Sequence, residues 1–427
     1  MQLAQLYALW KSCSGFTTDT RQLKPGYFFI ALRGERFDAN TFAQQALDAG
    51  AAYVLIDNPN YQLNERCLLV ENTLSTLQAL AAYHRQHFHI PVIAICGSNG
   101  KTTTKELTHA VLATTHQVHA TAGNLNNHIG VPLTLLRMPE TATIAVIEMG
   151  ANHLNETAEL CAIAQPTHGI ITNNGKDHLE GFGSIEQVKK ANAELYDYLE
   201  QTKGIAFVNA ADDDLMQFSQ PLQRVLYNTT TGHELSGQLM NAFPVLYGAI
   251  QLNQSALEFT SALAGEYNLV NILAAAAIGH YFNVADAAIK AAIEAYQPGN
   301  NRSQWMKWNG NEILMDCYNA NPSSMAIALQ SFSKMPVTNK MAVLGDMFEL
   351  GEYSFQEHAL VLAQAKASGI NQLVFVGKEW LKHKSEAIGV WFETTEAAKV
   401  WLKQQAIQNQ YILVKGSRGM ALEKLFE

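Results

Sequence analysis

The segment Gly97–Thr104, with the sequence GSNGKTTT, has the residue types and spacing of a phosphate-binding loop. It follows an apolar run at Val92–Cys96 and precedes a helical pattern that begins at Lys101. Glycines let the backbone curl so that its N–H groups surround phosphate oxygens, and the helix N-terminus adds partial positive charge. Lys101 can reach the outer phosphates, and the hydroxyl of Thr102 can ligate Mg²⁺. The segment predicts a nucleotide site formed by Gly97, Ser98, Asn99, Gly100, Lys101, Thr102 and Thr103.

One position departs from the usual G-x-x-x-x-G-K-[ST] pattern, because its first glycine would fall at Ile95. A glycine-rich turn that carries a solvated lysine is the alternative interpretation. The strand before the loop and the helix after it favour nucleotide binding.

A nucleotide site also needs a group that holds the metal, and two residues after apolar runs are candidates. Glu148 closes the run Thr143–Glu148, and His178 follows the run Gly169–Thr172. Carboxylate oxygen suits Mg²⁺, and imidazole nitrogen is a common metal ligand. The alternatives are a strand-terminal carboxylate that faces solvent and an ordinary surface or core histidine. We expect Thr102 and Glu148 to hold one metal ion and regard His178 as a candidate ligand of a second.

Strand-like and helix-like segments alternate along the chain, which predicts parallel sheets whose faces are covered by helices. Such sheets bind ligands at the carboxyl ends of their strands. With 427 residues and about 150 residues per domain, the length favours three domains. We predict an α/β fold with domains at residues 1–88, 89–297 and 298–427. The central one is expected to be a P-loop parallel-sheet domain and the last a Rossmann-like domain that starts after the turn-rich cluster Gln297–Asn301.

Individual elements follow from apolar runs and from hydrophobic spacing. The predicted strands are Tyr27–Leu32, Ala51–Ile56, Cys67–Val70, Val92–Cys96, Thr143–Glu148, Gly169–Thr172, Ile205–Asn209, Glu312–Met315, Met341–Leu344, Leu373–Val376 and Tyr411–Val414. The clearest predicted helices are Thr76–His87, Phe355–Lys366 and Thr395–Ala406.

The charge balance excludes several classes of partner. The chain has 29 Lys+Arg against 38 Asp+Glu, a formal net charge of −9, whereas binders of nucleic acid or anionic membranes need a positive surface. The longest apolar run, Ile272–Phe282, is too short for a bilayer, which needs about 20 residues. The N-terminus lacks the features of a signal peptide, and the five cysteines show no CxxC pairing. We therefore expect a cytoplasmic protein with no nucleic-acid partner and no membrane insertion.

Further motifs resemble the Mur ligase family, the ATP-dependent amide ligases that build the peptidoglycan stem peptide. The P-loop is similar to the ATP loop of that family. Other matches follow in the family's order, at Gly123–Pro132, Glu148–His153, His178–Ser184, Gly265–Asn271 and Asn300–Gln304. The segments Thr18–Arg21, Phe29–Gly34 with Phe37–Asp38, Asp316–Pro322, Gly345–Gly351 and Lys415–Gly419 are similar to those of the members that add D-alanyl-D-alanine. The resemblance covers nearly the whole chain.

The resemblance implies an enzyme, an ATP-dependent peptide ligase that joins D-alanyl-D-alanine to UDP-N-acetylmuramoyl-tripeptide through an acyl phosphate. It implies ATP and Mg²⁺ as cofactors, small-molecule substrates, a role in cytoplasmic peptidoglycan precursor synthesis, and a monomer. The third residue of the tripeptide, diaminopimelate or lysine, stays open.

The resemblance also assigns roles to residues. Lys101 and its loop would hold the ATP phosphates, Thr102 and Glu148 one Mg²⁺, and His178 a second. Asn127 would lie beside the γ-phosphate, and Asn268 and Asn271 would face the adenine, with a turn or helix-capping role as the alternative. From the third domain, Arg302 and Asp316 would reach the nucleotide phosphates and ribose.

Two further groups of residues are candidates for the other substrates. The residues expected to bind the UDP-muramoyl part are Asp19, Arg21, Arg33 and Asp38. Arg33 suits a pyrophosphate because of its planar fork, and ion pairing among these residues is the alternative. The residues expected near the dipeptide are Asn319, Asn321 and Ser324.

Asn192 departs from the family's pattern. Many Mur ligases carry at this position a lysine whose carbamate bridges the second metal, and asparagine cannot form a carbamate. Three interpretations stay open: Lys190 substitutes, His178 and water hold the second metal, or activity is reduced. We favour the second, because Lys190 lies two positions away and would project from a different helix face.

Two competing functions are weaker. A ligase that adds glutamate to folate is disfavoured by the Asn300–Gln304 and Asp316–Pro322 segments. A nucleotide-binding scaffold that has lost ligation is disfavoured by the joint retention of five residues: Lys101, Glu148, His178, Arg302 and Asp316.

Overall fold

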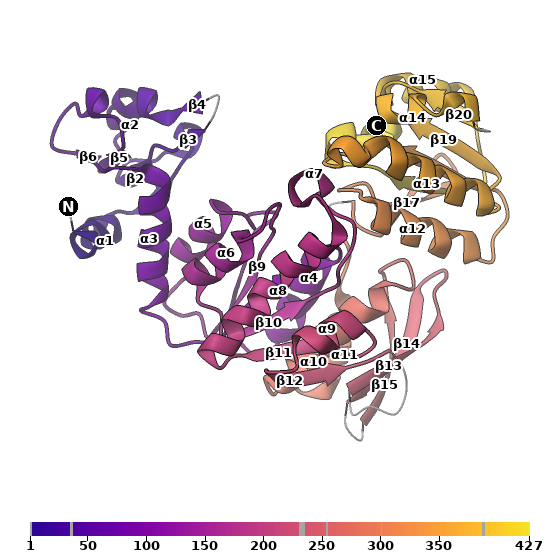
Figure 1. Ribbon diagram of the computed structural model, residues 1–427, viewed down its shortest axis with the longest axis horizontal. Helices are drawn as coiled ribbons and strands as arrows, with labels where there is room; N and C mark the ends of the chain where they lie inside the picture. The colour runs from indigo at the N-terminus through magenta and orange to yellow at the C-terminus, as the bar shows by residue number, and fades with distance from the viewer. Residues whose placement is uncertain (1, 35–36, 230–234, 253–254, 300, 387–388) are drawn as a thin grey trace.

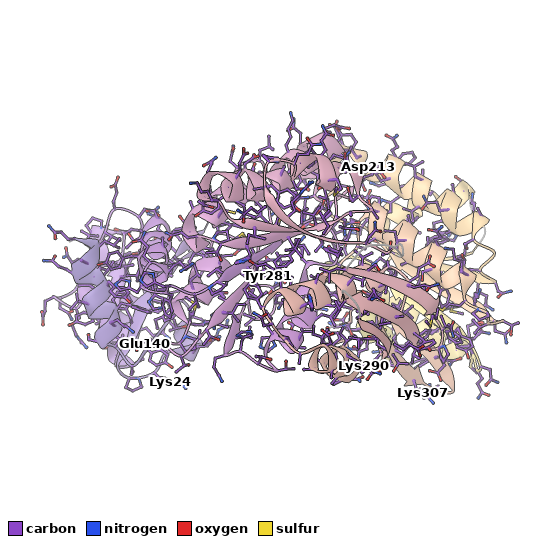
Figure 2. All side chains as sticks on the ribbon, turned by 90° about the horizontal axis from the view of Figure 1, so that it is seen from below. Lys24, Glu140, Asp213, Tyr281, Lys290 and Lys307 are labelled. Atoms are coloured by element: carbon purple, nitrogen blue, oxygen red, sulfur yellow. The ribbon has the colours of Figure 1, made fainter. Side chains whose placement is uncertain are left out.

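Three α/β units follow one another along the long axis of the computed structural model, from the indigo N-terminal unit to the yellow C-terminal unit (Figure 1). The structure describes residues 2–427 except 35–36, 230–234, 253–254, 300 and 387–388. Asn300, part of one sequence motif, therefore lies outside the described residues. The view turned by 90° keeps the same order of units (Figure 2). The predicted three-part α/β fold is confirmed.

The N-terminal unit is built on a four-stranded parallel sheet with the order β1-β2-β5-β6. Its strands are β1 (Gly15–Thr17), β2 (Tyr27–Ile30), β5 (Tyr53–Ile56) and β6 (Cys67–Leu69), with a two-stranded ribbon of β3 (Arg33–Gly34) and β4 (Phe37–Asp38). Its helices are α1 (Leu3–Ser12), α2 (Ala43–Asp48) and α3 (Thr73–Arg85).

The central unit contains a six-stranded parallel sheet with the order β12-β11-β10-β7-β9-β8. Its strands are β7 (Val92–Cys96), β8 (Val118–Ala120), β9 (Ile144–Glu148), β10 (His168–Ile171), β11 (Ile205–Asn209) and β12 (Gln223–Tyr227). Its helices are α4 (Lys101–Leu112), α5 (Gly130–Leu136), α6 (Glu156–Ala164), α7 (Leu179–Phe182), α8 (Ile185–Thr202), α9 (Asp213–Phe218), α10 (Asn268–Tyr281) and α11 (Asp286–Ala295).

Strand order in the central sheet decides where its functional loops meet. Strand β7 pairs with both β9 and β10, and every residue of these three strands is buried. Burial on both faces explains why the three segments read as continuous apolar runs. Because the strands are parallel, the P-loop after β7, Glu148 at the end of β9 and the loop after β10 reach the same sheet edge.

A three-stranded antiparallel sheet was not predicted. Its strands are β13 (Leu235–Asn241), β14 (Leu246–Leu252) and β15 (Ser255–Ser261). Helix α10 packs between this sheet and α4, the helix that follows the P-loop. The small sheet is therefore linked through α10 to α4, the helix that follows the P-loop.

The C-terminal unit contains a six-stranded sheet with the order β16-β17-β21-β18-β19-β20. Its strands are β16 (Gln304–Trp308), β17 (Asn311–Met315), β18 (Lys340–Gly345), β19 (Gln372–Val376), β20 (Val390–Phe392) and β21 (Tyr411–Lys415), and β16 alone is antiparallel to its neighbour. Its helices are α12 (Pro322–Lys334), α13 (Ser354–Ala367), α14 (Lys378–Leu381) and α15 (Thr395–Gln404). Short 3-10 helices in the chain are Thr20–Gln22, Ala39–Phe42, Pro59–Tyr61, Gly351–Tyr353, Lys384–Glu386, Arg418–Met420 and Leu422–Phe426.

Helix α3 joins the first two units, because it packs against α5 and α6 of the central unit. One hydrophobic core runs through both units, from Leu6 and Leu77 to Val92 and Leu133. The proposed domain boundary at residue 88 lies between α3 and β7, and the one at 298 lies between α11 and β16.

The five cysteines are free thiols. Over the described ranges, no helix is both long enough and apolar enough to cross a membrane.

Candidate active site

The P-loop connects β7 to α4 at the carboxyl end of the central sheet's strands, and both of its glycines have positive φ. Gly97 has φ +118° and Gly100 has φ +82°. A Cβ atom at Gly97 would lie 2.3 Å from Oγ1 of Thr172, and one at Gly100 would lie 2.6 Å from Oδ1 of Asn271. Both positions therefore require glycine for backbone conformation and for space.

Lys101 begins α4 and bends back over its own loop. Its ammonium donates to the carbonyl oxygens of Gly97 and, at 3.2 Å, Ser98. Carbonyl groups carry only partial negative charge, so the lysine keeps its full positive charge within the site. This arrangement suits an anionic ligand held by the first turn of the helix, whose N–H groups lack intrahelical partners.

Glu148 is the buried carboxylate of the site. Its Oε1 accepts from Oγ1 of Thr102 at 3.0 Å and from Nδ2 of Asn126 at 2.8 Å. Its Oε2 is buried and has no hydrogen-bond partner among the described residues, with Nζ of Lys105 at 4.0 Å as the nearest cation. A buried, unpartnered carboxylate oxygen is costly unless a cation binds it, so Glu148 and Thr102 fit a Mg²⁺ ion.

The metal would have to complete its shell with other oxygens. No group of three or more His, Cys, Asp or Glu side chains that could hold a metal ion occurs in the part of the chain that the structure describes. Magnesium commonly binds through one or two protein ligands and keeps phosphate oxygens and water as the others. The sparse protein shell is therefore what a nucleotide-bound Mg²⁺ needs.

A cavity of about 630 Å³ lies between the central and C-terminal units and brings most of the predicted site residues together. Those that line it are Ser98, Asn99, Gly100, Lys101, Thr102, Thr103, Asn127, Glu148, His178, Asn268, Asn271, Arg302, Asp316, Asn319, Asn321 and Ser324. Gly97 supports the loop without lining the cavity. The four predicted residues of the N-terminal unit lie elsewhere.

Three asparagines of this group already use part of their hydrogen-bonding capacity. The Oδ1 atom of Asn127 accepts from the N–H groups of Ile129 and Gly130, at 3.2 and 2.9 Å, ahead of α5. Nδ2 of Asn271 donates to Oδ1 of Asn268 at 2.9 Å. Asn268 donates in turn to the carbonyl of Ala264 at 2.6 Å. The two buried amides thus brace the start of α10 beneath the P-loop, and adenine contact stays a prediction.

The C-terminal unit places a cation and an ion pair opposite the P-loop. The guanidinium of Arg302 lies 3.8 Å from the ring centroid of Tyr318, and its buried Nε has no hydrogen-bond partner among the described residues. Asp316 accepts from Nζ of Lys415 at 2.6 Å and from the N–H of Ser303 at 3.2 Å. Arg302 therefore retains capacity for an anion, while the Asp316 carboxylate is largely neutralised by Lys415.

Two of the residues predicted near the dipeptide also cap a helix. Asn321 and Ser324 form a capping box at the start of α12, with bonds of 2.8 Å from the Ser324 N–H and 3.1 Å from the Asn321 N–H. Nδ2 of Asn321 also donates to Oδ1 of Asn99 in the P-loop, at 2.9 Å. Oδ1 of Asn319 accepts from the N–H of Ala320 at 2.9 Å. Asn321 therefore ties the start of α12 to the nucleotide loop.

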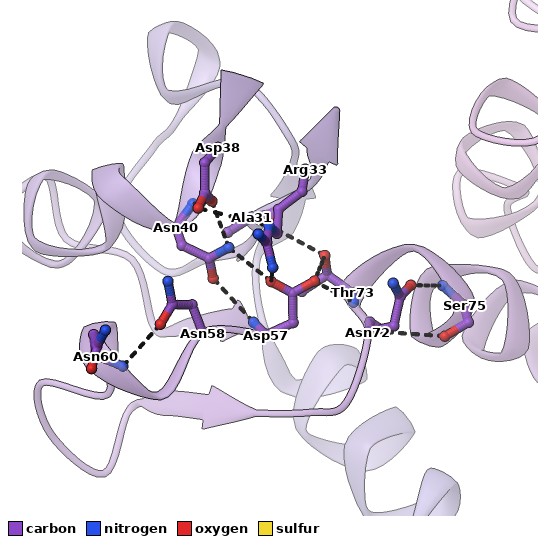
Figure 3. Close-up of polar contacts among 10 residues, drawn as sticks. All are labelled: Ala31, Arg33, Asp38, Asn40, Asp57, Asn58, Asn60, Asn72, Thr73 and Ser75. Carbon is purple, nitrogen blue, oxygen red and sulfur yellow. Dashed lines mark hydrogen bonds and ion pairs between the residues drawn. The ribbon is translucent and has the colours of Figure 1, made fainter. Parts of the chain in front are cut away.

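The predicted residues of the N-terminal unit form ion pairs with one another. Arg21 and Asp19 form an exposed pair at 2.8 Å. Nε of Arg33 lies 3.7 Å from Asp38, and its Nη1 lies 3.8 Å from Asp57. Figure 3 shows Arg33, Asp38 and Asp57 in one polar network with Asn40. Arg33 is still 54% exposed, so its role in substrate binding stays a prediction.

Comparison with known proteins places this geometry in a family. Residues 95–279 match the model described as the Mur ligase middle domain, and residues 301–418 match the one described as the Mur ligase glutamate ligase domain. The UDP-N-acetylmuramoyl-tripeptide–D-alanyl-D-alanine ligase of Bacillus subtilis is 36% identical over 424 residues, which is 96% of this chain and 92% of the relative. The enzyme of the same name from Escherichia coli is 37% identical with the same coverage. The chain belongs to the Mur ligase family.

Solved structures support the same conclusion for the fold of this Mur ligase. MurF from Acinetobacter baumannii superposes with a TM-score of 0.88 at 29% identity, covering 99% of this chain and 97% of that one. The MurF ligase of Thermotoga maritima in complex with ADP superposes with a TM-score of 0.86 at 25% identity, covering 96% and 95% of the two chains. The family resemblance inferred from motifs is confirmed.

Several residues that line the Mur ligase cavity were missed as site residues. They include Asn126, Tyr318, Glu349 and Lys415. Lys415 could have been found, because it directly follows the predicted strand Tyr411–Val414 and begins the motif Lys415–Gly419. Asn126 and Tyr318 also lie within quoted motifs, but their partners Glu148 and Arg302 are distant in sequence. Glu349 contacts a residue of another domain, which no local pattern reveals.

Asn192 lies on the buried face of α8 in this Mur ligase. Its side chain donates to Oδ1 of Asn174 at 2.9 Å, and Asn174 lies in the loop that leads to His178. Lys190 is exposed on another face of the same helix. The structure therefore disfavours substitution by Lys190, which agrees with the helix-face argument.

Proposed function

We propose that the chain is an ATP-dependent ligase that joins D-alanyl-D-alanine to UDP-N-acetylmuramoyl-tripeptide. The single observation that carries the proposal is the cavity in which the P-loop and Glu148 of the central unit face Arg302 and Lys415 of the C-terminal unit. The names of relatives that match 96% of the chain support the same substrates. Action in the cytoplasm and as a monomer stays part of the proposal.

The chemistry needs an activated carboxyl group, because a free carboxylate is a poor acyl donor. The terminal carboxylate of the tripeptide attacks the γ-phosphorus of ATP, which forms an acyl phosphate and releases ADP. The amine of the dipeptide then adds to the acyl carbon, and the tetrahedral intermediate expels inorganic phosphate and loses a proton. The protein's contribution is positioning and charge stabilisation.

The proposed roles follow from the contacts in the cavity. The N–H groups at the start of α4 and the ammonium of Lys101 would bind the ATP phosphates. Thr102 and Glu148 would hold Mg²⁺, which neutralises phosphate charge when bound. Arg302 would bind a phosphate from the opposite side, and Asn127 would lie beside the γ-phosphate. The walls of the two units would exclude water that could hydrolyse the acyl phosphate.

The other two substrates would approach from different sides. The UDP-muramoyl part is proposed to bind the N-terminal unit near Arg33 and Asp38, and the dipeptide to bind near Asn319 and α12. This assignment of substrate-binding sites follows the proposed domains at residues 1–88, 89–297 and 298–427.

Incubation of the protein with ATP, Mg²⁺, UDP-N-acetylmuramoyl-tripeptide and D-alanyl-D-alanine tests the proposal. We expect stoichiometric release of phosphate and formation of the pentapeptide product, measured by coupled phosphate assay and mass spectrometry. Omission of the dipeptide is the control and should prevent product formation. Absence of product with every component present would refute the proposed ligation. Parallel reactions with tripeptides ending in diaminopimelate or lysine would identify the third residue.

Gly100→Ala is expected to abolish nucleotide binding. The new Cβ would meet Asn271, 2.6 Å away, and alanine would also have to adopt φ +82°. Gly310→Ala is a matched control, since Gly310 has φ +77° with nothing within 4 Å of the added Cβ. Both variants carry about 1–2 kcal/mol of left-handed strain, but only Gly100→Ala crowds the P-loop. Calorimetric titration with ADP checks this, and equal affinity in both variants would contradict it.

Asn192 leads to a prediction about bicarbonate. Because the buried amide of Asn192 is hydrogen bonded to Asn174 and cannot be carbamoylated, we expect the ligation rate to be independent of added bicarbonate. Initial rates in degassed buffer and in buffer with bicarbonate measure this. A severalfold rise in the wild-type rate would argue against it. Asn192→Lys is the complementary variant, in which bicarbonate dependence should appear if the site accepts a carbamate.

A further inference from the structure

A side-chain contact across the cavity joins the predicted metal ligand to a carboxylate of another domain. Nδ1 of His178 lies 2.9 Å from Oε2 of Glu349. His178 precedes α7 in the loop after β10, and Glu349 lies in the loop after β18. Both residues line the same cavity as Lys101. The C-terminal unit thus places a carboxylate directly against a functional loop of the central unit.

Main-chain contacts hold the two loops in this arrangement. His178 has φ +47° and Glu349 has φ +63°, a conformation that is uncommon outside glycine. The carbonyl of Glu349 accepts from the N–H of Glu180 at 3.0 Å. A Cβ added at Gly351 would lie 3.2 Å from Cγ of Glu180, so the loops approach closely at that point. The pair is therefore set by the backbone of both loops rather than by two freely moving side chains.

The charge on Glu349 suits it to accept a hydrogen bond. Oε2 of Glu349 lies within hydrogen-bond distance of Nδ1 of His178, at 2.9 Å, and an ordinary carboxyl group is ionised near neutral pH. An ionised carboxylate only accepts hydrogen bonds, so Nδ1 of the imidazole must carry the proton. The lone pair of a neutral imidazole is then on Nε2, the arrangement found in carboxylate–histidine–metal triads.

We propose that Glu349 is a positioning residue that holds His178 as the Nδ1–H tautomer, so that docking of the C-terminal unit prepares Nε2 to ligate a metal ion. The inference rests on the proposed function and on the expectation, drawn from the family resemblance, that His178 ligates a second metal ion. Since the two residues belong to different domains, rotation of the C-terminal unit away from the central unit breaks the pair. Thermodynamic linkage then requires that the metal favours docking as much as docking favours the metal.

An ion pair elsewhere on the same interface supplies a matched control. Nζ of Lys176 lies 2.6 Å from Oε1 of Glu357 in α13, and the main-chain N–H of Lys176 donates to Oγ of Ser323 at 2.8 Å. This pair also joins the two units, but it does not touch the imidazole of His178. Loss of Glu357 should therefore weaken docking without removing the acceptor of Nδ1–H.

Long-range ¹⁵N–¹H correlation spectra of histidine-labelled, metal-free protein at pH 8.5 test the tautomer directly. His178 is assigned from the signal lost in His178→Asn. In the wild type and in Glu357→Ala we expect a protonated Nδ1 and an unprotonated Nε2. In Glu349→Ala we expect a mixture of the two tautomers. A wild-type Nε2–H tautomer, or an unchanged pattern in Glu349→Ala, would overturn the inference.

The dependence of the ligation rate on Mg²⁺ concentration gives a second measurement. Glu349→Ala should raise the half-saturating Mg²⁺ concentration about tenfold or more, the usual effect of removing such a partner. Glu357→Ala should change it by less than about threefold, as expected for a partly exposed ion pair. Equal Mg²⁺ dependence of Glu349→Ala and wild type would overturn the inference while leaving ligation intact. A wild type that shows the Nδ1–H tautomer but forms no product would refute the proposed function alone.

Discussion

Lys101→Ala is expected to lower kcat for ligation by roughly three orders of magnitude, the scale for loss of one preorganised electrostatic partner. The ammonium of Lys101 donates to the carbonyls of Gly97 and Ser98, which leaves its positive charge uncompensated by those partners. ATP would bring several negative charges into a protein whose net charge is −9. Few cations are available in the cavity to offset them, so loss of one has a large effect.

The expected loss falls mainly on kcat because negative charge moves onto the bridging oxygen as the γ-phosphoryl group is transferred. Initial rates of phosphate release at saturating ATP measure it. Lys307→Ala is the matched control, because Lys307 lies on β16 with its side chain 85% exposed and is labelled in Figure 2. Retention of more than about a tenth of wild-type kcat by Lys101→Ala would contradict the assigned role.

Glu148→Gln is expected to lower kcat by roughly two to three orders of magnitude while leaving the folded protein at least as stable. Glutamine has nearly the same shape and can keep an oxygen acceptor for Thr102 and Asn126. It removes the charge on the buried Oε2 atom, which has no hydrogen-bond partner among the described residues. The charge that would bind Mg²⁺ is therefore lost. The cost of burying a charged oxygen without a hydrogen bond is lost as well, and this offsets loss of the 4.0 Å ion pair with Lys105.

This opposite response of activity and stability separates a metal-binding role from a structural one. The melting temperature of metal-free protein and the Mg²⁺ dependence of the rate are the two measurements. Glu140→Gln is the control, since the Glu140 side chain, labelled in Figure 2, is 78% exposed. A Glu148→Gln variant that melts well below the wild type, with an unchanged Mg²⁺ requirement, would show that the carboxylate supports the fold instead.

Buried parallel strands were the most predictable part of the fold. The predicted strands Val92–Cys96 and Ile205–Asn209 coincide with β7 and β11. Such strands are apolar on both faces and end at glycine or polar turns, so local sequence is informative. The antiparallel sheet of β13, β14 and β15 was missed for the opposite reason. In β14 buried and half-buried residues alternate, and glycine and glutamine interrupt the apolar pattern.

Prediction of the site followed the same division between local and distant information. Lys101 and Glu148 were predictable because each lies at the end of a buried strand or at the start of the following helix. The partners that complete the site come from elsewhere: Asn126 contacts Glu148 from the loop before α5, and Glu349 contacts His178 from another domain. Only the folded structure shows which of several polar residues contacts a site residue from another loop or another domain.

The N-terminal unit shares one of its two hydrophobic clusters with the central unit. Leu6 and Leu77 belong to the same cluster as Val92 and Leu133, whereas the C-terminal unit forms two clusters almost wholly from its own residues. Cooperative unfolding follows shared apolar contacts rather than architectural divisions. The first two units should therefore melt together and the third by itself. A chain with three architectural domains then has two thermodynamic folding units, and the ATP cleft lies on the boundary between them.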